Sequence, residues 1–304
     1  MDNKDYFSSF IDRLFSIKKQ TLILLSIFFL GLVLRAVAAI NLSVSADDMH
    51  FVTHAVDFYK SDRLVTYDQS SGLWFAITSI FYNLFGATQL ASRLAALIFG
   101  SLTILAVYFL SKEFFDEKIA LLAAFILAIS PFHIKLTIAE QDVMAMFFVV
   151  FSMFVFIKAI KSEKQFLFLA AGVLMGLAIY TKVYPLLFIP SLLIYLAYWR
   201  KKNKPKAPLS KKEVKNILVF LFMIFIFAIP ALAHNYLLYQ DKGFMDLQFT
   251  RTLGFGKEKS AEYYSWDHQF SAKSDWSGLV FGGSSNSGSQ TPTLIQAINY
   301  IRRG

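Results

Sequence analysis

The sequence predicts an all-α protein that crosses a membrane several times. Of its 304 residues 56% are hydrophobic, 33 are Phe, and the mean hydropathy is +0.50. A water-soluble domain of this length does not normally carry so much apolar sequence. Several apolar stretches also approach the ~20 residues with which a helix crosses a bilayer. The chain has no cysteine, so disulfides are excluded.

Eight apolar segments follow one another along the chain, and each is a candidate helix. The first lacks the small-residue cleavage pattern of a signal peptide, so we expect it to be a permanent helix. The second is too short to cross a bilayer comfortably, and Trp74 and Tyr82 within it fit an aromatic belt at the membrane interface. The candidates are 21–40, 73–86, 91–111, 119–139, 143–160, 166–182, 184–199 and 216–235.

Basic residues between these segments indicate which helix ends face the cytoplasm. Eight lie within 200–215, and shorter basic stretches occur at 111–118, at 158–164 and just before the first segment. Loops rich in Lys and Arg stay cytoplasmic, and all four basic regions share that side only if 73–86 does not cross. We therefore predict seven spans, a cytoplasmic N-terminus, and a juxtamembrane helix over 73–86 within the first outer loop, 41–90.

This topology divides the chain into three parts. They are a cytoplasmic segment over 1–20, a transmembrane domain over 21–235 and an extracytoplasmic loop over 236–304. The last part is polar and aromatic, with a Gly/Ser-rich stretch over 277–289. Such a loop normally connects two spans, so we expect the chain to lack C-terminal sequence. The net charge of +9 belongs to loops that flank apolar segments and does not indicate a nucleic-acid partner.

Two acidic motifs fall on the outer side of the predicted membrane. Asp47 and Asp48 follow the first span, and Glu140 and Asp142 lie at the start of the fourth. Each motif can simply begin a helix, because acids complement the positive end of the helix dipole. A carboxylate at a membrane edge is also a candidate catalytic group that can take a proton from an attacking hydroxyl. The topology puts both motifs on one face, which favours a shared site.

Several cationic or ionisable side chains are candidates for binding an anion beside those acids. Arg35 lies inside the first span and Arg93 opens the second. Lys182 and His234 end later spans, and His50 follows the acidic pair. Snorkelling to the headgroups or a structural contact would also explain such residues. A charged leaving group in a membrane enzyme would need cations in these places.

A series of different short motifs lies along residues 20–240. The first of them is Ala46-Asp47-Asp48-Met49-His50-Phe51. The others are Leu34-Arg35, Leu84-Phe85-Gly86, Ser92-Arg93-Leu94, Ser130-Pro131-Phe132, Glu140-Gln141-Asp142, the stretch 176–182, Ile229-Pro230 and His234-Asn235-Tyr236. This order resembles the C superfamily of glycosyltransferases, and more closely the protein O-mannosyltransferase and lipid A aminoarabinose-transferase families. Two departures from those families are Asp48, where their motif has Glu, and the lack of proline in 67–72.

The resemblance implies an all-α transmembrane helix bundle of that superfamily. It implies an enzyme that moves a sugar from a polyprenyl phosphate to a hydroxyl outside the cytoplasm, with inversion. Asp47 would be the general base and Asp48 would assist it, while Glu140 and Asp142 would complete an acidic wall. Cations and polar groups would bind the lipid phosphate or the acceptor, namely Arg35, His50, Arg93, Lys182 and His234. The sugar stays open, and the acceptor stays open among protein, lipid and glycan.

Two alternatives accompany this interpretation. The mannosyltransferase-like families work without a metal, and we expect no cofactor here. The oligosaccharyltransferase branch uses a divalent cation such as Mg²⁺ or Mn²⁺, for which Asp47, Glu140 and Asp142 would be the ligands. A non-enzymatic lipid or sugar transporter would predict inverted repeats and broken helices near the midplane, and neither is evident in the sequence.

Overall fold

The structure is a computed structural model that describes residues 18–43, 52, 55–56, 72–205, 207–246, 250, 256 and 258. All the regular elements in this part of the chain are helices, as the sequence predicts. In chain order they are α2 (Lys19–Asn41), α4 (Gly72–Phe85), α5 (Gln89–Lys112), α6 (Glu117–Ile129), α7 (Pro131–Leu136), α8 (Gln141–Ser162), α9 (Gln165–Thr181), the 3₁₀ turn η1 (Tyr184–Leu187), α10 (Phe188–Asn203) and α11 (Lys211–Lys242).

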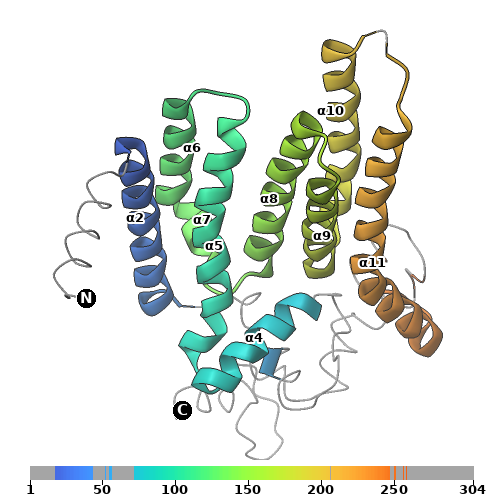
Figure 1. The fold of residues 1–304 in the computed structure, drawn as a ribbon. Coiled ribbons are helices and arrows are strands. Elements are labelled where there is room, and N and C mark those ends of the chain that lie inside the picture. The colour runs from blue at the N-terminus through green and yellow to red at the C-terminus, as the bar shows by residue number, and fades with distance from the viewer. Residues whose placement is uncertain are drawn as a thin grey trace, which may run out of the picture.

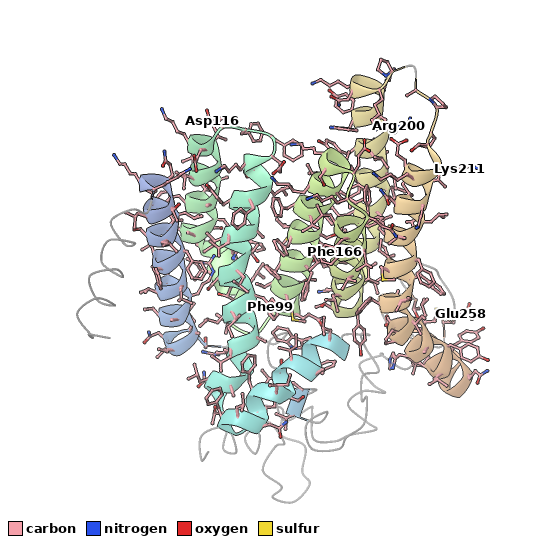
Figure 2. The ribbon with its side chains drawn as sticks, in the orientation of Figure 1. Phe99, Asp116, Phe166, Arg200, Lys211 and Glu258 are labelled. Atoms are coloured by element: carbon pink, nitrogen blue, oxygen red, sulfur yellow. The ribbon has the colours of Figure 1, made fainter. Side chains whose placement is uncertain are left out.

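The long helices stand side by side in a bundle that has two distinct ends (Figure 1). At one end lie the start of α2 and the α5–α6, α8–α9 and α10–α11 connections. These are the four regions in which the sequence concentrates Lys and Arg, so we call this the basic end. Figure 2 shows Asp116, Arg200 and Lys211 there. Helix α4 lies across the opposite end, which we call the α4 end.

Within the described residues, four helices are long and apolar enough to cross a membrane on their own: α2, α5, α8 and α11. Helices α4 and α9 are apolar but shorter. The predicted span over 119–139 is two helices, because Pro131 has no N–H to continue α6. The span predicted from residue 184 begins with the 3₁₀ turn. A multi-pass membrane bundle is therefore established, while the count of seven spans stays a prediction.

Small residues allow helices α9 and α11 to pack closely. Gly172 and Gly176 are spaced four apart on α9, and a Cβ at Gly172 would lie 2.5 Å from the backbone oxygen of Phe220 on α11. A Cβ at Gly176 would lie 2.4 Å from Cβ of Phe227. Because lipid tails are as apolar as the helices, close van der Waals packing of this kind holds membrane helices together.

Helix α4 is fixed to the bundle by its aromatic face. Trp74, Phe75 and Tyr82 are almost wholly buried, at 1%, 2% and 1% exposure. Both rings are therefore covered by protein, and their position at the membrane interface stays a prediction. Gly72 begins the helix against Tyr180 of α9, where a Cβ would come within 2.4 Å of the Tyr180 hydroxyl oxygen.

Helix α11 bends and continues past the predicted end of its span at residue 235. The bend is visible in Figure 1, and Pro230 inside the helix removes a backbone hydrogen bond there. The helix ends at Lys242, with Gly243 in the left-handed conformation at φ +76°. The chain after α11 is tied back to the helix by two hydrogen bonds. The Asp246 N–H donates to the Asn235 side-chain oxygen at 2.8 Å, and the Asn235 amide donates to the Asp246 carboxylate at 3.0 Å.

Candidate functional site

The acidic motif Glu140-Gln141-Asp142 forms the start of α8 at the α4 end of the bundle. Glu140 is the N-cap residue and is partly buried, while Gln141 is fully buried. Asp142 lies in the first helical turn, where its carboxylate complements the helix dipole. Helix α7 precedes the motif and brings the chain back toward α8. The local fold thus explains the acids as helix-starting residues and also leaves them at the end of the bundle where α4 lies.

Lys182 lies beside Asp142, although 40 residues separate them in sequence. It is the C-cap residue of α9, and its Nζ lies 2.5 Å from Oδ2 of Asp142. The Tyr184 hydroxyl also donates to the backbone oxygen of Asp142, at 3.3 Å. Helices α8 and α9 pack along each other, so the first turn of one meets the last turn of the other. This ion pair is the centre of the candidate site.

The Asp142–Lys182 pair is accessible from outside the protein. The Lys182 side chain is 19% exposed and that of Asp142 is 31% exposed. A lysine ammonium has three N–H donors, so one can stay on Asp142 while the others bind a further anion. The arrangement can hold a phosphate beside a carboxylate, with the carboxylate fixing the position of the ammonium group.

Arg35, a predicted phosphate ligand, is fully buried among protein groups. Its guanidinium donates to the backbone oxygens of Leu127 and Ala128 at 3.0 Å each, and to Nδ1 of His133 at 2.8 Å. Those carbonyls belong to the last turn of α6, where Pro131 provides no backbone donor. Arg35 therefore satisfies the helix break between α6 and α7, as a membrane interior requires. Its role in phosphate binding stays a prediction without support from these contacts.

Arg93, the second arginine in the predicted set, has a similar position at another helix end. Its guanidinium donates to the backbone oxygens of Ala39 and Leu42, the latter at 3.0 Å. Helix α2 ends at Asn41, so Arg93 satisfies carbonyls at its C-terminus and ties α2 to the start of α5. A contact with a lipid phosphate stays a prediction for this residue too.

His234 is partly buried on α11, one turn beyond Pro230. Its Nε2 is buried and has no hydrogen-bond partner within the part of the chain that the structure describes. The predicted role of His234 in binding the lipid phosphate or the acceptor stays a prediction.

Three predicted residues, Asp47, Asp48 and His50, lie outside the described residues. The alternative metal ligand set contains Asp47 and so cannot be assembled from the described residues alone. Within those residues, no group of three His, Cys, Asp or Glu side chains is placed to hold a metal ion. The roles of Glu140 and Asp142 as acids of the site stay predictions.

Some polar groups at the α4 end were not predicted from the sequence to belong to the site. Tyr184 contacts Asp142, and α4 carries two buried polar atoms, Nε1 of Trp74 and Oγ1 of Thr78, that have no hydrogen-bond partner among the described residues. Tyr184 lies two residues after Lys182, and this closeness in sequence was the one feature that could have pointed to it. For Trp74 and Thr78, the spacing of four on a short apolar helix gave a common face but not its burial.

Several solved structures share this fold. The Archaeoglobus fulgidus oligosaccharyltransferase in the apo form matches with a TM-score of 0.62 and 17% identity, over 94% of this chain and 37% of that one. The same archaeal enzyme with an inhibitory peptide and a dolichol-phosphate gives a TM-score of 0.56, 16% identity, and coverage of 93% and 36%. ArnT from Cupriavidus metallidurans bound to undecaprenyl phosphate gives a TM-score of 0.53 and 16% identity, over 86% of this chain and 49% of that one. The chain thus spans between about a third and a half of those proteins.

The fold and these similarities define a protein of the C superfamily of glycosyltransferases. The chain belongs to the dolichyl-phosphate-mannose-protein mannosyltransferase family, whose sequence pattern matches residues 72–234. That match contains Arg93, Glu140, Asp142, Lys182 and His234 and begins after Asp47. No curated protein matches the chain.

Proposed function

We propose that this chain carries the membrane part of an enzyme that transfers a sugar from a polyprenyl phosphate to a hydroxyl group outside the cytoplasm. The proposal is supported by the family match over 72–234 and by the acid–lysine pair at the α4 end. Two proteins of the same fold have been solved with dolichol-phosphate and with undecaprenyl phosphate. Both ligands combine a long apolar chain with a phosphate, the kind of molecule that a membrane bundle with a cation at one end can hold.

In the proposed reaction the acceptor oxygen attacks the anomeric carbon from the side opposite the phosphate. The new carbon–oxygen bond forms as the bond from the anomeric carbon to the phosphate oxygen breaks, so the configuration inverts. The acceptor proton goes to the Asp47 carboxylate, and the bonding electrons stay on the departing polyprenyl phosphate. Asp48 would orient Asp47 or the acceptor. A phosphate leaves without general-acid help, but its charge needs a nearby cation.

Lys182 is the described cation best placed for that charge. Its ion pair with Asp142 holds the ammonium group at the end of α9, and both side chains are partly exposed. Asp142 thereby becomes a positioning residue for Lys182 and, with Glu140, a wall of the acceptor side. Arg35 and Arg93 contribute by holding helix ends. The pairing of Asp142 with Lys182 is the single observation on which this division of roles rests.

Replacement of Asp47 tests the reaction directly. Membranes containing the whole protein with Asp47→Asn should fail to transfer labelled sugar from a polyprenyl-phosphate sugar, since the amide cannot take the acceptor proton. Binding of labelled donor to the same membranes should persist. Asp116→Asn is the matched control, because it makes the same chemical change at the basic end and Asn also caps α6.

Full transfer by the Asp47→Asn protein, at normal expression, would show that Asp47 is not the base. Incubation with EDTA separates the two branches of the superfamily. We expect transfer to continue without divalent cations, whereas its loss on chelation and recovery with Mg²⁺ or Mn²⁺ would favour the metal-dependent, oligosaccharyltransferase-like alternative.

A further inference from the structure

A groove of about 450 Å³ opens between α10 and α11 at the basic end of the bundle. Of the residues along it, Leu193 and Ile217 are half-buried and Ala197 is exposed. Figure 2 shows Arg200 and Lys211, near the adjoining ends of the two helices, at the basic end and far from α4. Because it lies at the basic end, the groove is separate from the candidate glycosyltransferase site. Its volume is within the range of small-molecule sites.

The groove has apolar walls and a cationic rim. The walls include Leu193 and Ala197 from α10 and Ile217 from α11. The rim includes Arg200, Lys201 and Lys204. This order, with apolar side chains deeper in the bundle and cations at its end, matches the order of acyl chain and headgroup in a phospholipid.

The rim keeps a positive excess after its internal ion pairs are counted. Lys204 pairs with Glu163 at 2.5 Å and with Glu213 at 3.2 Å, and Nε of Arg200 lies 3.4 Å from Glu213. The carboxylates hold Lys204 at the mouth of the groove, and Nη2 of Arg200 donates to the backbone oxygens of Ala207 and Pro208 at 2.9 and 3.0 Å. Lys201 is exposed and has no ion pair among the described residues. An added anion would thus find one uncompensated ammonium group beside two positioned cations.

A buried polar side chain lies next to the groove. Asn216 is 2% exposed, and its Oδ1 has no hydrogen-bond partner within the described part of the chain. It lines a small inner cavity of about 20 Å³ that shares Arg200 and Ile217 with the groove. An acceptor left unpaired in this position is costly unless a donor reaches it. A cavity of this size has room for a water molecule, which can supply the donor.

We propose that this groove binds an anionic phospholipid from the membrane leaflet at the basic end. The acyl chain would lie along the apolar walls, and Lys201 with the positioned Arg200 and Lys204 would bind the phosphate. A soluble phosphate would use the rim but not the walls, and a zwitterionic lipid would bring its own cation toward Lys201. The observations therefore favour a lipid with net negative charge.

Thermal unfolding of the purified whole protein in detergent tests this site with defined lipids. Added phosphatidylglycerol should raise the unfolding temperature in a saturable way, because a ligand of the folded state stabilises it. Phosphatidylcholine at the same concentration should have little effect. Lys201→Gln should raise the half-saturating concentration of phosphatidylglycerol about fivefold, the effect of losing one cation near a charged lipid surface. Ala197→Trp should abolish saturation by filling the groove.

Lys118→Gln is the matched control. Lys118 is exposed at the same end, and its substitution removes the same charge outside the groove. It should respond to phosphatidylglycerol like the unmodified protein. Equal weakening by Lys118→Gln and Lys201→Gln would indicate attraction to the whole basic end and overturn the site. So would an unchanged response of Ala197→Trp, or equal stabilisation by glycerol phosphate, which lacks acyl chains.

Discussion

Asp142 and Lys182 show how two side chains acquire a role through contact. Each alone fits an ordinary helix end, since Asp142 begins α8 and Lys182 follows α9. Joined at 2.5 Å and partly exposed, they form a fixed charge pair that a phosphate can approach. The carboxylate limits the motion of the ammonium group, so less conformational entropy is lost when an anion binds.

Lys182→Gln should weaken use of the polyprenyl-phosphate donor. Loss of a charge-assisted contact of about 1.5–3 kcal/mol corresponds to a rise of about tenfold or more in KM for the donor. Initial transfer rates at varied donor concentration measure it. Lys135→Gln is the control, because Lys135 is exposed on the segment that leads into α8 and loses the same charge. Equal KM values for the Lys182 variant and the unmodified protein would remove Lys182 from the donor site.

Arg35→Lys should destabilise the protein without changing donor KM. Lysine keeps the charge but has one nitrogen in place of the Nη1 and Nη2 fork that reaches Leu127, Ala128 and His133, so polar groups at the α6–α7 break lose partners. We expect a loss of about 2 kcal/mol in the free energy of unfolding. Thermal unfolding and donor titration on one preparation separate the two effects. An unchanged unfolding temperature with a raised KM would restore Arg35 as a phosphate ligand.

At the scale of helices, the contact of α9 with α11 depends on two glycines. Gly172→Ala puts a Cβ 2.5 Å from the Phe220 backbone oxygen, which cannot move without moving α11. We expect destabilisation of about 1–3 kcal/mol, typical of overpacking, seen as a lower unfolding temperature in detergent. Val173→Ile adds the same single carbon beside it, at a partly exposed position, and should have little effect. If both variants unfold alike, the close approach does not matter to stability.

The α5–α6 turn is joined to α8 by Glu113, whose carboxylate lies 2.9 Å from Lys158 and 2.7 Å from Lys161. Burial raises the pKa of Glu113, but hydrogen bonds and attraction from the two lysines outweigh it and hold the pKa below the ordinary value of 4.5. The folded state then binds fewer protons than the unfolded state. This stabilisation is present above pH 4.5 and is lost as the pH falls through the lowered pKa.

Glu113→Gln should therefore lower stability at pH 7, by about 1 kcal/mol for a pair with partly exposed lysines. The difference from the unmodified protein should shrink below pH 4.5. Unfolding temperatures across this pH range provide the measurement. Asp116→Asn, in the same turn, keeps a capping side chain and should show a smaller difference. A Glu113→Gln deficit that stays constant down to low pH would contradict the ion-pair explanation.

The helices could be predicted because hydropathy is a property of each segment alone. Residue roles depended on partners that the sequence does not reveal. Arg35 meets α6 carbonyls 92 and 93 residues away, and only Pro131, which deprives that helix of a donor, hinted at the need. Asp142 and Lys182 were chosen by residue type, but their pairing required the packing of α8 on α9. The burial of Trp74 could not be predicted because a short apolar helix does not show which of its faces is covered by protein.

The orientation of the whole molecule in the membrane is predicted from its basic loops and can be measured by labelling. The bundle gathers its basic connections at one end and α4 at the other (Figure 1). Asn83 on α4 and Asn203 at the end of α10 are well matched for labelling. Both are exposed, and each donates to the carbonyl four residues before it, at 2.9 and 2.8 Å. The chain has no cysteine, so a single introduced thiol reports one position.

With basic loops inside the cell, Asn83→Cys should react with a membrane-impermeant maleimide on intact cells. Asn203→Cys should react only after the membrane is permeabilised. Both thiols should react fully in detergent, which controls for burial of the side chain. The reverse pattern on intact cells would invert the bundle and move the Asp142–Lys182 pair to the cytoplasmic side. A polyprenyl phosphate displayed outside the cytoplasm could then not reach it, so this measurement also bears on the proposed reaction.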